Sequence, residues 1–161
     1  LMSSDKLISN ESVRLVPFRW YHLKAMRMRE DNTDMFVYIP DFETRIMIFD
    51  GAPNCHTAIA DGNIVACWGA QELWPHVAEC WLFTSTHFNS YPISATRGAD
   101  RYFNQLAISL KLKRLQLTVN SKNSLAVRWA KRLRFETEGL MRSYGPDGSD
   151  YFMTSRIFAN E

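Results

Sequence analysis

The chain has 161 residues, of which 46% are hydrophobic and 22% charged, and its formal net charge is +2. This length suffices for one substantial core and is too short for two ordinary domains, so we expect a single domain over residues 1–161. The composition is globular, and no apolar run approaches the roughly 18 residues of a membrane span. The opening stretch is polar, so we expect a soluble, cytoplasmic protein with neither a secretory leader nor a membrane partner.

The cysteines are widely spaced and form no C-x-x-C pair; they are Cys55, Cys67 and Cys80. This pattern predicts neither a disulfide framework nor a metal site. It is typical of a protein from a reducing compartment.

The first predicted elements are one strand and two helices. Residues 12–17 alternate weakly between polar and apolar types and predict a strand that Pro17 ends. Helical spacing over about residues 19–30 predicts the first helix. A second, short helix is expected after Pro40, and Gly51 should end it.

Three strands are predicted next. The dipeptide Asp61-Gly62 is a strong hairpin signal and separates two strands at residues 55–60 and 63–70. Residues 74–76 predict another turn, and residues 77–84 predict a fourth strand, whose bulky apolar residues suit a central position.

The remaining elements alternate between helix and strand. A long helix is expected between Pro92 and Leu112, followed by a strand over residues 115–119. A helix begins at Ser124, and we expect its buried face to carry Leu125, Trp129 and Leu133.

The chain should end in a hairpin. Phe135 opens a strand, the turn 145–148 reverses the chain, and residues 150–158 form the last strand. The predicted order is therefore β-α-α-β-β-β-α-β-α-β-β.

Short motifs in the last third of the chain carry a resemblance to a known family. They are Asn123 with Ala126, Leu133-Arg134-Phe135, Glu138-Gly139, and Asp147-Gly148 followed by Tyr151. This run resembles the C-terminal half of the GNAT superfamily of N-acetyltransferases, especially its ribosomal-protein and amino-acid acetylating branch. The segment 79–85 is also similar to small phage-encoded members of the superfamily.

The resemblance implies a mixed α/β fold. Its central, mostly antiparallel sheet splays between the fourth and fifth strands and carries helices on both faces. It also implies an acetyl-CoA-dependent enzyme that transfers an acyl group directly to a primary amine of a protein, peptide or small metabolite.

The loop that would hold the coenzyme pyrophosphate departs from the family pattern. The family has Arg/Gln-x-x-Gly-x-Gly/Ala here, and only Ala95 of the segment 90–95 fits. Pro92 lacks an N–H donor and Ile93 is β-branched. A loop shifted toward Gly98 would bind phosphate through other groups. The predicted binding residues here are Ser94, Ala95, Thr96 and Arg97.

The resemblance assigns the fourth strand two roles. Its backbone would hold the pantetheine arm and polarise the thioester, through Trp81, Leu82, Phe83 and Thr84. Glu79 occupies the position of a general base in some relatives, and the alternative is a strand-end carboxylate that is exposed or paired. His76 and His87 are the other candidate proton acceptors.

Two further residues follow from the same comparison. The tyrosine that protonates the departing sulfur in many relatives is replaced by Ala130, which leaves Tyr144 or Tyr91 as substitutes. Asn123 matches a residue that contacts the coenzyme, and helix N-capping is its alternative role.

Charge is unevenly distributed along the chain. Between Lys111 and Arg134 there are eight basic residues and no acidic one. A solvated face, a rim for coenzyme phosphates and a nucleic-acid surface all fit this run. The run has no interleaved aromatic platform, so we place coenzyme ahead of nucleic acid. The region expected to form the amine-acceptor end is acidic and would attract a cationic amine, and ordinary loop polarity is its alternative interpretation. Its residues are Asp31, Asp34, Tyr38, Asp41 and Glu43.

A second hypothesis keeps the fold without the catalysis. The changed loop and the absent tyrosine also fit an inactive binding module, either virion-associated or directed at a host protein. Aromatic residues near Phe88 and Tyr91 would then belong to a protein interface. The sequence leaves the acceptor, the acyl chain and a homodimeric state open.

Overall fold

A computed structural model of the chain describes residues 13–26 and 39–159. The described elements, in order, are β1 (Val13–Pro17), α2 (Trp20–Ala25), α4 (Phe42–Ile46), η1 (Met47–Phe49), β2 (His56–Ala60), β3 (Asn63–Trp74), β4 (Val77–Thr84), η2 (Phe88–Ser90), α5 (Pro92–Ser109), β5 (Arg114–Asn120), α6 (Ser124–Arg132), β6 (Glu136–Met141) and β7 (Tyr151–Ile157). This order of helices and strands is the predicted one.

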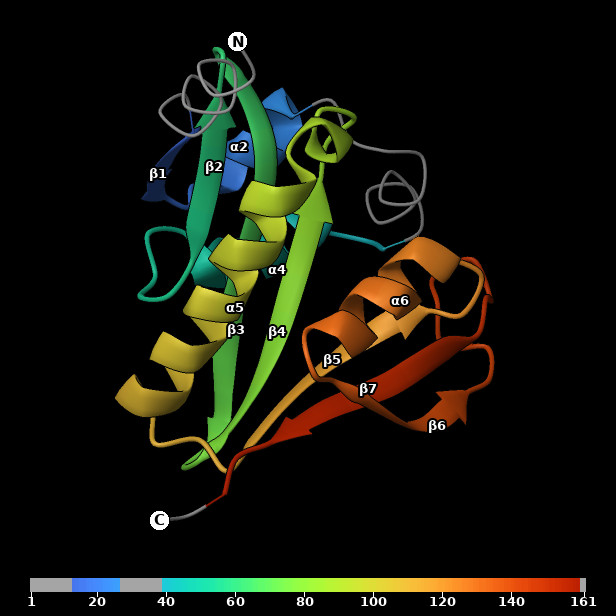
Figure 1. Cartoon of the computed structure of the whole chain (residues 1–161). Helices are drawn as coiled ribbons and strands as arrows, with labels where there is room; N and C mark the ends of the chain where they lie inside the picture. Colours follow the sequence, from blue (N-terminus) through green and yellow to red (C-terminus); the bar gives the residue numbers. More distant parts are fainter. Residues whose placement is uncertain (1–12, 27–38, 160–161) are drawn as a thin grey trace, which may run out of the picture. The chain divides into compact units, whose positions relative to one another are not determined.

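The strands form a mixed, mostly antiparallel sheet in the order β1-β2-β3-β4-β5-β7-β6 (Figure 1). The pairs β1–β2, β2–β3, β5–β7 and β6–β7 are antiparallel, and β4–β5 is parallel. The parallel pairing covers three residues, Val77–Glu79 opposite Arg114–Gln116. The two strands therefore pair only at their beginnings, as the predicted splay requires.

By its internal packing the chain divides into two compact units. Unit 1 comprises Leu1–Gly69 with Leu82–Ala95, and unit 2 comprises Ala70–Trp81 with Thr96–Glu161. No helix in the described ranges has both the length and the hydropathy needed to cross a membrane.

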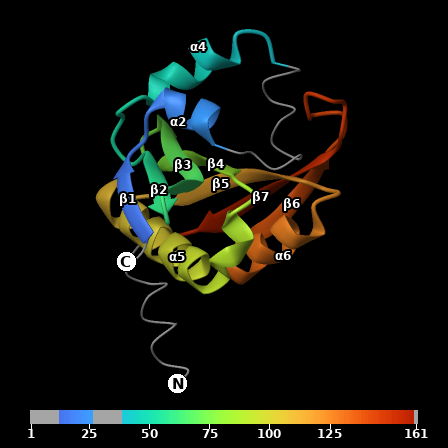
Figure 2. The ribbon, with the colours of Figure 1, turned by 90° about the horizontal axis from the view of Figure 1, so that it is seen from above.

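Unit 1 is built on the β2–β3 hairpin. Asp61 and Gly62 have φ values of 51° and 76°, which are the left-handed conformations that a tight hairpin turn requires. A small apolar cluster forms beneath the hairpin from Ala58, Ala60 and Val65. The helices α2 and α4 lie on the same side of β1–β3 (Figure 2).

The first helix is shorter than the sequence predicts. Helix α2 ends at Ala25, because Met26 is extended, with ψ of 132°, and its side chain is only 6% exposed. Burial of this methionine in an extended conformation takes precedence over the helical spacing. Residues 27–30 of the predicted helix lie outside the described residues, as do Asp31, Asp34 and Tyr38 of the expected acceptor region.

The second helix agrees with its prediction. The α4 and η1 segments bury Phe42 and Ile46, and the chain turns at Gly51 with φ of 65°. Phe42 meets the ring of Phe83 edge to face, with the ring centroids 5.8 Å apart. An aromatic contact thus holds α4 against β4 within unit 1.

Unit 2 has an apolar core of its own. Helices α5 and α6 lie side by side on one face of β5 and β7 (Figure 2). The core residues are Ala78, Phe103, Leu106, Leu112, Leu115, Val119, Ala130, Leu133 and Phe135. Phe103 and Phe135 meet at 5.1 Å between centroids, so α5 and the segment after α6 share this core.

Two predictions about unit 2 are wrong. Leu125 of α6 is 58% exposed, while Ala126 and Ala130 face the core instead. Small alanine side chains allow the helix backbone to approach its neighbours closely, whereas leucine would hold it away. Strand β3 continues to Trp74, four residues beyond the predicted end at Ala70.

Candidate active site

Glu79 lies where the pairing between β4 and β5 ends. It stands opposite Gln116 at the last position of the parallel register. The residue is half-buried, and in the described part of the chain its carboxylate has no hydrogen bond or ion pair. A general base needs a carboxylate that is not already bonded to a donor, and Glu79 meets this condition among the described residues; its assignment as the base stays a prediction.

The rest of β4 continues past this point. Leu82 is partly exposed, whereas Phe83 is buried and packs on Phe42. The Phe83 side chain therefore belongs to the core of unit 1. Trp81 and Thr84 are half-buried. The assignment of all four residues to coenzyme binding stays a prediction.

The loop with the changed pattern forms the start of α5. Pro92 is the first residue of this helix, where a backbone N–H has no partner inside the helix. The proline is therefore well suited to its position and costs the helix nothing, although a phosphate still has one donor fewer. The side chain of Ile93 is exposed, and the N–H of Ala95 donates to Tyr91 O at 2.9 Å.

The next residues of α5 suit the binding of an anion only in part. Thr96 Oγ1 accepts the indole N–H of Trp129 at 3.1 Å, so its oxygen is engaged. Arg97 is exposed and has no ion pair among the described residues. At Gly98 a Cβ would meet no atom within 4 Å, so this turn of the helix is open.

Asn123 caps α6. Its Oδ1 accepts the backbone N–H of Ala126 at 3.1 Å, which satisfies one of the donors left free at the start of the helix. The structural role left open by the sequence is therefore present. A contact with the coenzyme stays a prediction.

The candidate proton donors differ in their surroundings. Ala130 is 5% exposed inside the core, so a tyrosine at this position would displace core side chains. Tyr144 is 54% exposed and packs edge to face on Tyr151 at 5.4 Å. The Tyr91 hydroxyl donates to Asp61 Oδ2 at 2.6 Å, and this hydrogen bond raises the pKa of Tyr91. Of the two substitutes, Tyr144 is the more exposed residue, and the Tyr91 hydroxyl is already bonded to Asp61.

The ring of His76 and the backbone of His87 each take part in a hydrogen bond. His76 Nδ1 lies 2.8 Å from Lys111 O, so this nitrogen carries the proton and donates it to the carbonyl. The backbone N–H of His87 donates to Ser85 Oγ at 3.1 Å within a tight turn. Neither contact indicates a catalytic role.

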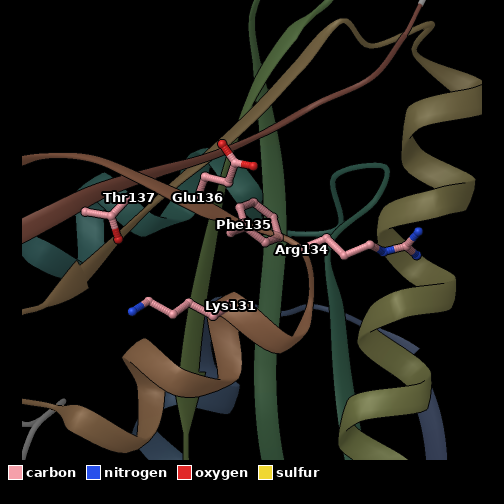
Figure 3. A pocket seen from close by; sticks show the side chains of 5 residues that line it. All are labelled: Lys131, Arg134, Phe135, Glu136 and Thr137. Carbon is pink, nitrogen blue, oxygen red and sulfur yellow. The ribbon is translucent and has the colours of Figure 1, made fainter.

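A hollow that no sequence pattern predicted lies at the C-terminal end of α6. The hollow has a volume of about 520 Å³ and is lined by Lys131, Arg134, Phe135, Glu136 and Thr137 (Figure 3). The Arg134 side chain reaches toward α5, and Lys131 points to the other side of α6 (Figure 3). None of the predicted site residues lines this hollow.

Close to this hollow, Arg156 of β7 is buried. Its side chain is 9% exposed, and its Nη2 donates to Asn104 Oδ1 at 2.7 Å. Its Nη1 lies 3.8 Å from Asp100 Oδ1. These partners lie far from Arg156 in the sequence, so no local pattern could have revealed them.

No group of His, Cys, Asp or Glu side chains within residues 13–26 and 39–159 is arranged to hold a metal ion. Cys67 is buried, and its burial raises the pKa of the thiol to about 12. This thiol therefore stays protonated and is unsuited to nucleophilic chemistry.

Comparison with known proteins finds matches among solved structures but none among family models or curated sequences. No family model matches the chain, and no curated protein matches it in sequence. Among solved structures, a GNAT-family acetyltransferase from Bacillus anthracis matches with a TM-score of 0.66 and 17% identity, over 91% of this chain and 95% of that one. The chain has the GNAT fold.

Two further solved structures also match this chain over most of its length. Ard1 from Thermoplasma volcanium matches with a TM-score of 0.67 and 14% identity, over 92% of this chain and 99% of that chain. RimL, a ribosomal L7/L12 alpha-N-protein acetyltransferase in complex with coenzyme A, matches with a TM-score of 0.68 and 15% identity, over 91% and 94%. The GNAT fold implied by the sequence motifs is therefore confirmed.

Proposed function

We propose that this chain is an acetyl-CoA-dependent N-acetyltransferase that passes the acetyl group directly to a primary amine of a protein, peptide or small metabolite. The observation that carries the proposal is the short parallel pairing of β4 with β5, which ends at Glu79, whose carboxylate has no partner among the residues that the structure describes. Structures with this fold that are described as acetyltransferases, among them RimL with coenzyme A, support it.

The residues present fit the coenzyme in part. The backbone of β4 beyond Glu79 would hold the pantetheine arm. The phosphates would meet Arg97 and the first turn of α5, with Gly98 leaving room for them. Arginine suits this role because its guanidinium forms paired hydrogen bonds with phosphate oxygens.

Side chains of the chain itself would accept and donate the protons in this reaction. The coenzyme, when bound, supplies the acetyl thioester. Glu79 would accept the proton that the amine nitrogen loses on bonding to the acetyl carbon, while the thiol of the coenzyme would be the leaving group. The Tyr144 hydroxyl, or water in its place, donates a proton to the departing sulfur. Backbone N–H groups of β4 stabilise negative charge on the acetyl oxygen.

The acceptor is proposed by chemical class alone. Of the acidic residues expected at the acceptor end, Glu43 pairs with Lys24 at 2.7 Å, which neutralises its charge. Asp41 is exposed at the start of α4. A cationic amine would therefore meet Asp41 rather than Glu43 among the described residues.

A second candidate function is the inactive binding module. The buried Ala130, in place of a donor tyrosine, favours it. However, Phe88 and Tyr91 pack against the apolar cluster of unit 1, and the Tyr91 hydroxyl is bonded to Asp61. The interface of exposed aromatics expected for the module is thus not available at these two residues, and we rank the enzyme first.

A thiol-release assay tests the proposed activity. The full chain is incubated with acetyl-CoA and, separately, with a polyamine, free amino acids and peptides with free N-termini. The enzyme predicts release of free coenzyme thiol that depends on one amine class, and a matching mass increase of that amine. No thiol release with any amine, together with no thermal stabilisation by millimolar acetyl-CoA, would favour the binding module instead.

A further inference from the structure

Helices α5 and α6 each turn a pair of arginines to solvent. Arg97 and Arg101 stand one helical turn apart on α5, and Arg128 and Arg132 do so on α6. All four side chains are exposed. We refer to these four residues as the arginine face.

Two contacts hold the two helices together, so the four arginines share one surface of unit 2. The Trp129 indole donates to Thr96 Oγ1 at 3.1 Å, and Arg134 Nη2 lies 2.7 Å from Asp100 Oδ1. Thr96 and Asp100 follow one another on α5 in the same order as their partners, Trp129 of α6 and Arg134 of the turn just after α6, so α5 and α6 run parallel here. Packed helices lie about 8–10 Å apart, and residues one turn apart about 5–6 Å, so the arginines form a compact quadrilateral.

The arginine face has no neutralising acid of its own. Asp100 is the one acidic residue between Pro92 and Phe135 in the sequence. It already lies 2.7 Å from Arg134 and 3.8 Å from Arg156. In the described part of the chain, none of the four arginines has an ion pair. Like charges one turn apart destabilise a helix slightly, so folding stability does not account for the arrangement.

The chemistry of the face favours phosphate. Guanidinium groups bind phosphate oxygens in pairs, and a regular set of them suits a ligand with regularly spaced negative charges. The nearest aromatic side chains on the outer turns are engaged, since Trp129 is half-buried and its N–H is bonded to Thr96. Unpaired bases would find no stacking platform here, whereas a duplex presents only its phosphates and needs none.

We propose that the arginine face binds the phosphate backbone of a double-stranded nucleic acid without reading its sequence. This goes beyond the proposed acetyl transfer and reverses the ranking made from the sequence. In the sequence, coenzyme ranked ahead of nucleic acid on the basic run from Lys111 to Arg134 alone. In the structure, α6 carries Arg128 and Arg132 of that run and lies beside α5, which carries Arg97 and Arg101 (Figure 2).

Fluorescence anisotropy with the full chain tests the proposal. Labelled duplexes and single strands of about 20 nucleotides are titrated between about 50 and 200 mM salt. The face predicts binding of duplexes in preference to single strands, with a log–log salt slope of about −3 to −4 for four neutralised phosphates. No binding at the lowest salt, or tighter binding of the single strand, overturns it.

A matched pair of triple variants locates the binding. The first carries Arg101→Gln, Arg128→Gln and Arg132→Gln, and leaves Arg97 in place because it belongs to the predicted coenzyme set. We expect its salt slope to fall by about 3 and its duplex affinity at the lowest salt by at least about tenfold. Its thermal stabilisation by acetyl-CoA should be unchanged, which separates this proposal from the proposed function.

The control variant has the same change in net charge elsewhere. It carries Lys111→Gln, Lys113→Gln and Arg142→Gln, all at exposed positions outside α5 and α6. Duplex affinity should stay within about threefold of the parent. An equal loss in both variants overturns the proposal, because binding would then reflect net charge alone.

Two competitors complete the experiment. Because Arg97 also belongs to the predicted coenzyme set, saturating acetyl-CoA should lower the salt slope of duplex binding by no more than about 1. If acetyl-CoA instead displaces the duplex completely, the whole face is part of the coenzyme site and the proposal fails. If a polyglutamate peptide of the same length binds more tightly than the duplex at equal salt, the face suits an acidic protein partner and the proposal again fails.

Discussion

Glu79 is the residue on which the proposed chemistry depends most directly, because it is the candidate base whose carboxylate has no partner among the described residues. Glu79→Gln keeps the size of the side chain and removes its ability to take a proton. We expect turnover to fall by about 10²–10⁴-fold with acetyl-CoA affinity unchanged, as is usual when a general base is lost.

The matched control is Glu72→Gln, an exposed carboxylate on β3 in the same unit. Steady-state thiol release and calorimetric binding should be compared for both variants. Equal turnover for the Glu79 variant and the parent would remove this residue from the proposed scheme.

His22 connects the protein's stability to pH. Its Nδ1 lies 2.8 Å from Thr57 Oγ1 and accepts the backbone N–H of Arg19 at 3.1 Å. Burial and the nearby Arg19 charge lower the pKa of His22, although Asp50 acts in the opposite direction. A protonated Nδ1 could still donate to Thr57 Oγ1 but could not accept the Arg19 N–H, so the Arg19 contact requires Nδ1 to be unprotonated.

The sign of the pH dependence follows from this lowered pKa. Below the ordinary value of about 6.5, the unfolded chain binds more protons at His22 than the folded chain, so stability falls as pH decreases. Urea unfolding midpoints should therefore drop between about pH 7 and pH 5. His22→Asn should reduce this dependence but not remove it, because burial also lowers the pKa of His56. The same slope in parent and variant would contradict the assignment.

Among the elements, α6 allows the two roles of Asn123 to be separated. Asn123→Ala removes the N-cap bond to Ala126 and should lower the free energy of unfolding by about 1 kcal/mol. Asn123→Asp keeps an oxygen acceptor and should preserve stability. If the asparagine amide also binds the coenzyme, Asn123→Asp will weaken acetyl-CoA binding at unchanged stability. Undiminished stability in Asn123→Ala would refute the capping role.

Alanine substitution at two glycines, one in α5 and one in the loop between β6 and β7, should change the free energy of unfolding in opposite directions. A Cβ at Gly145 would press on Ser149 Oγ and lie 2.7 Å from the Tyr151 ring, so Gly145→Ala should destabilise by about 1–3 kcal/mol. A Cβ at Gly98 meets nothing, so Gly98→Ala inside a helix should stabilise by about 0.5–1 kcal/mol. Chemical denaturation of both variants checks the pair, and a shift of the same sign in both would contradict it.

Strong local signals explain which elements the sequence could predict. Asp61-Gly62 takes positive φ values that few other pairs tolerate, and β4 runs from Val77 to Thr84 as predicted. Helical spacing alone was less informative. It fitted Leu125 as well as Ala126 and could not show which of them packs against the core. It also extended α2 beyond Ala25, because it does not register the burial of an extended Met26.

At the scale of the whole molecule, the order of the elements could be predicted and the contacts between distant segments could not. The Tyr91–Asp61 bond joins residues 30 apart in the sequence, and Arg156 meets Asn104 across 52 residues. Local periodicity contains no information about such partners. The same limit explains why the basic run was recognised without its extension onto α5, where the arginine face begins.

Glu79 and the residues at the start of α5 could be proposed from the sequence because the resemblance supplied their roles. Their chemistry depends on whether the whole chain binds the coenzyme. Calorimetric titration of the full chain with acetyl-CoA tests this most directly. The proposed function predicts one-to-one binding with a dissociation constant of roughly 1 μM to 1 mM, the range usual for enzyme substrates. No heat and no thermal stabilisation at millimolar acetyl-CoA would contradict it.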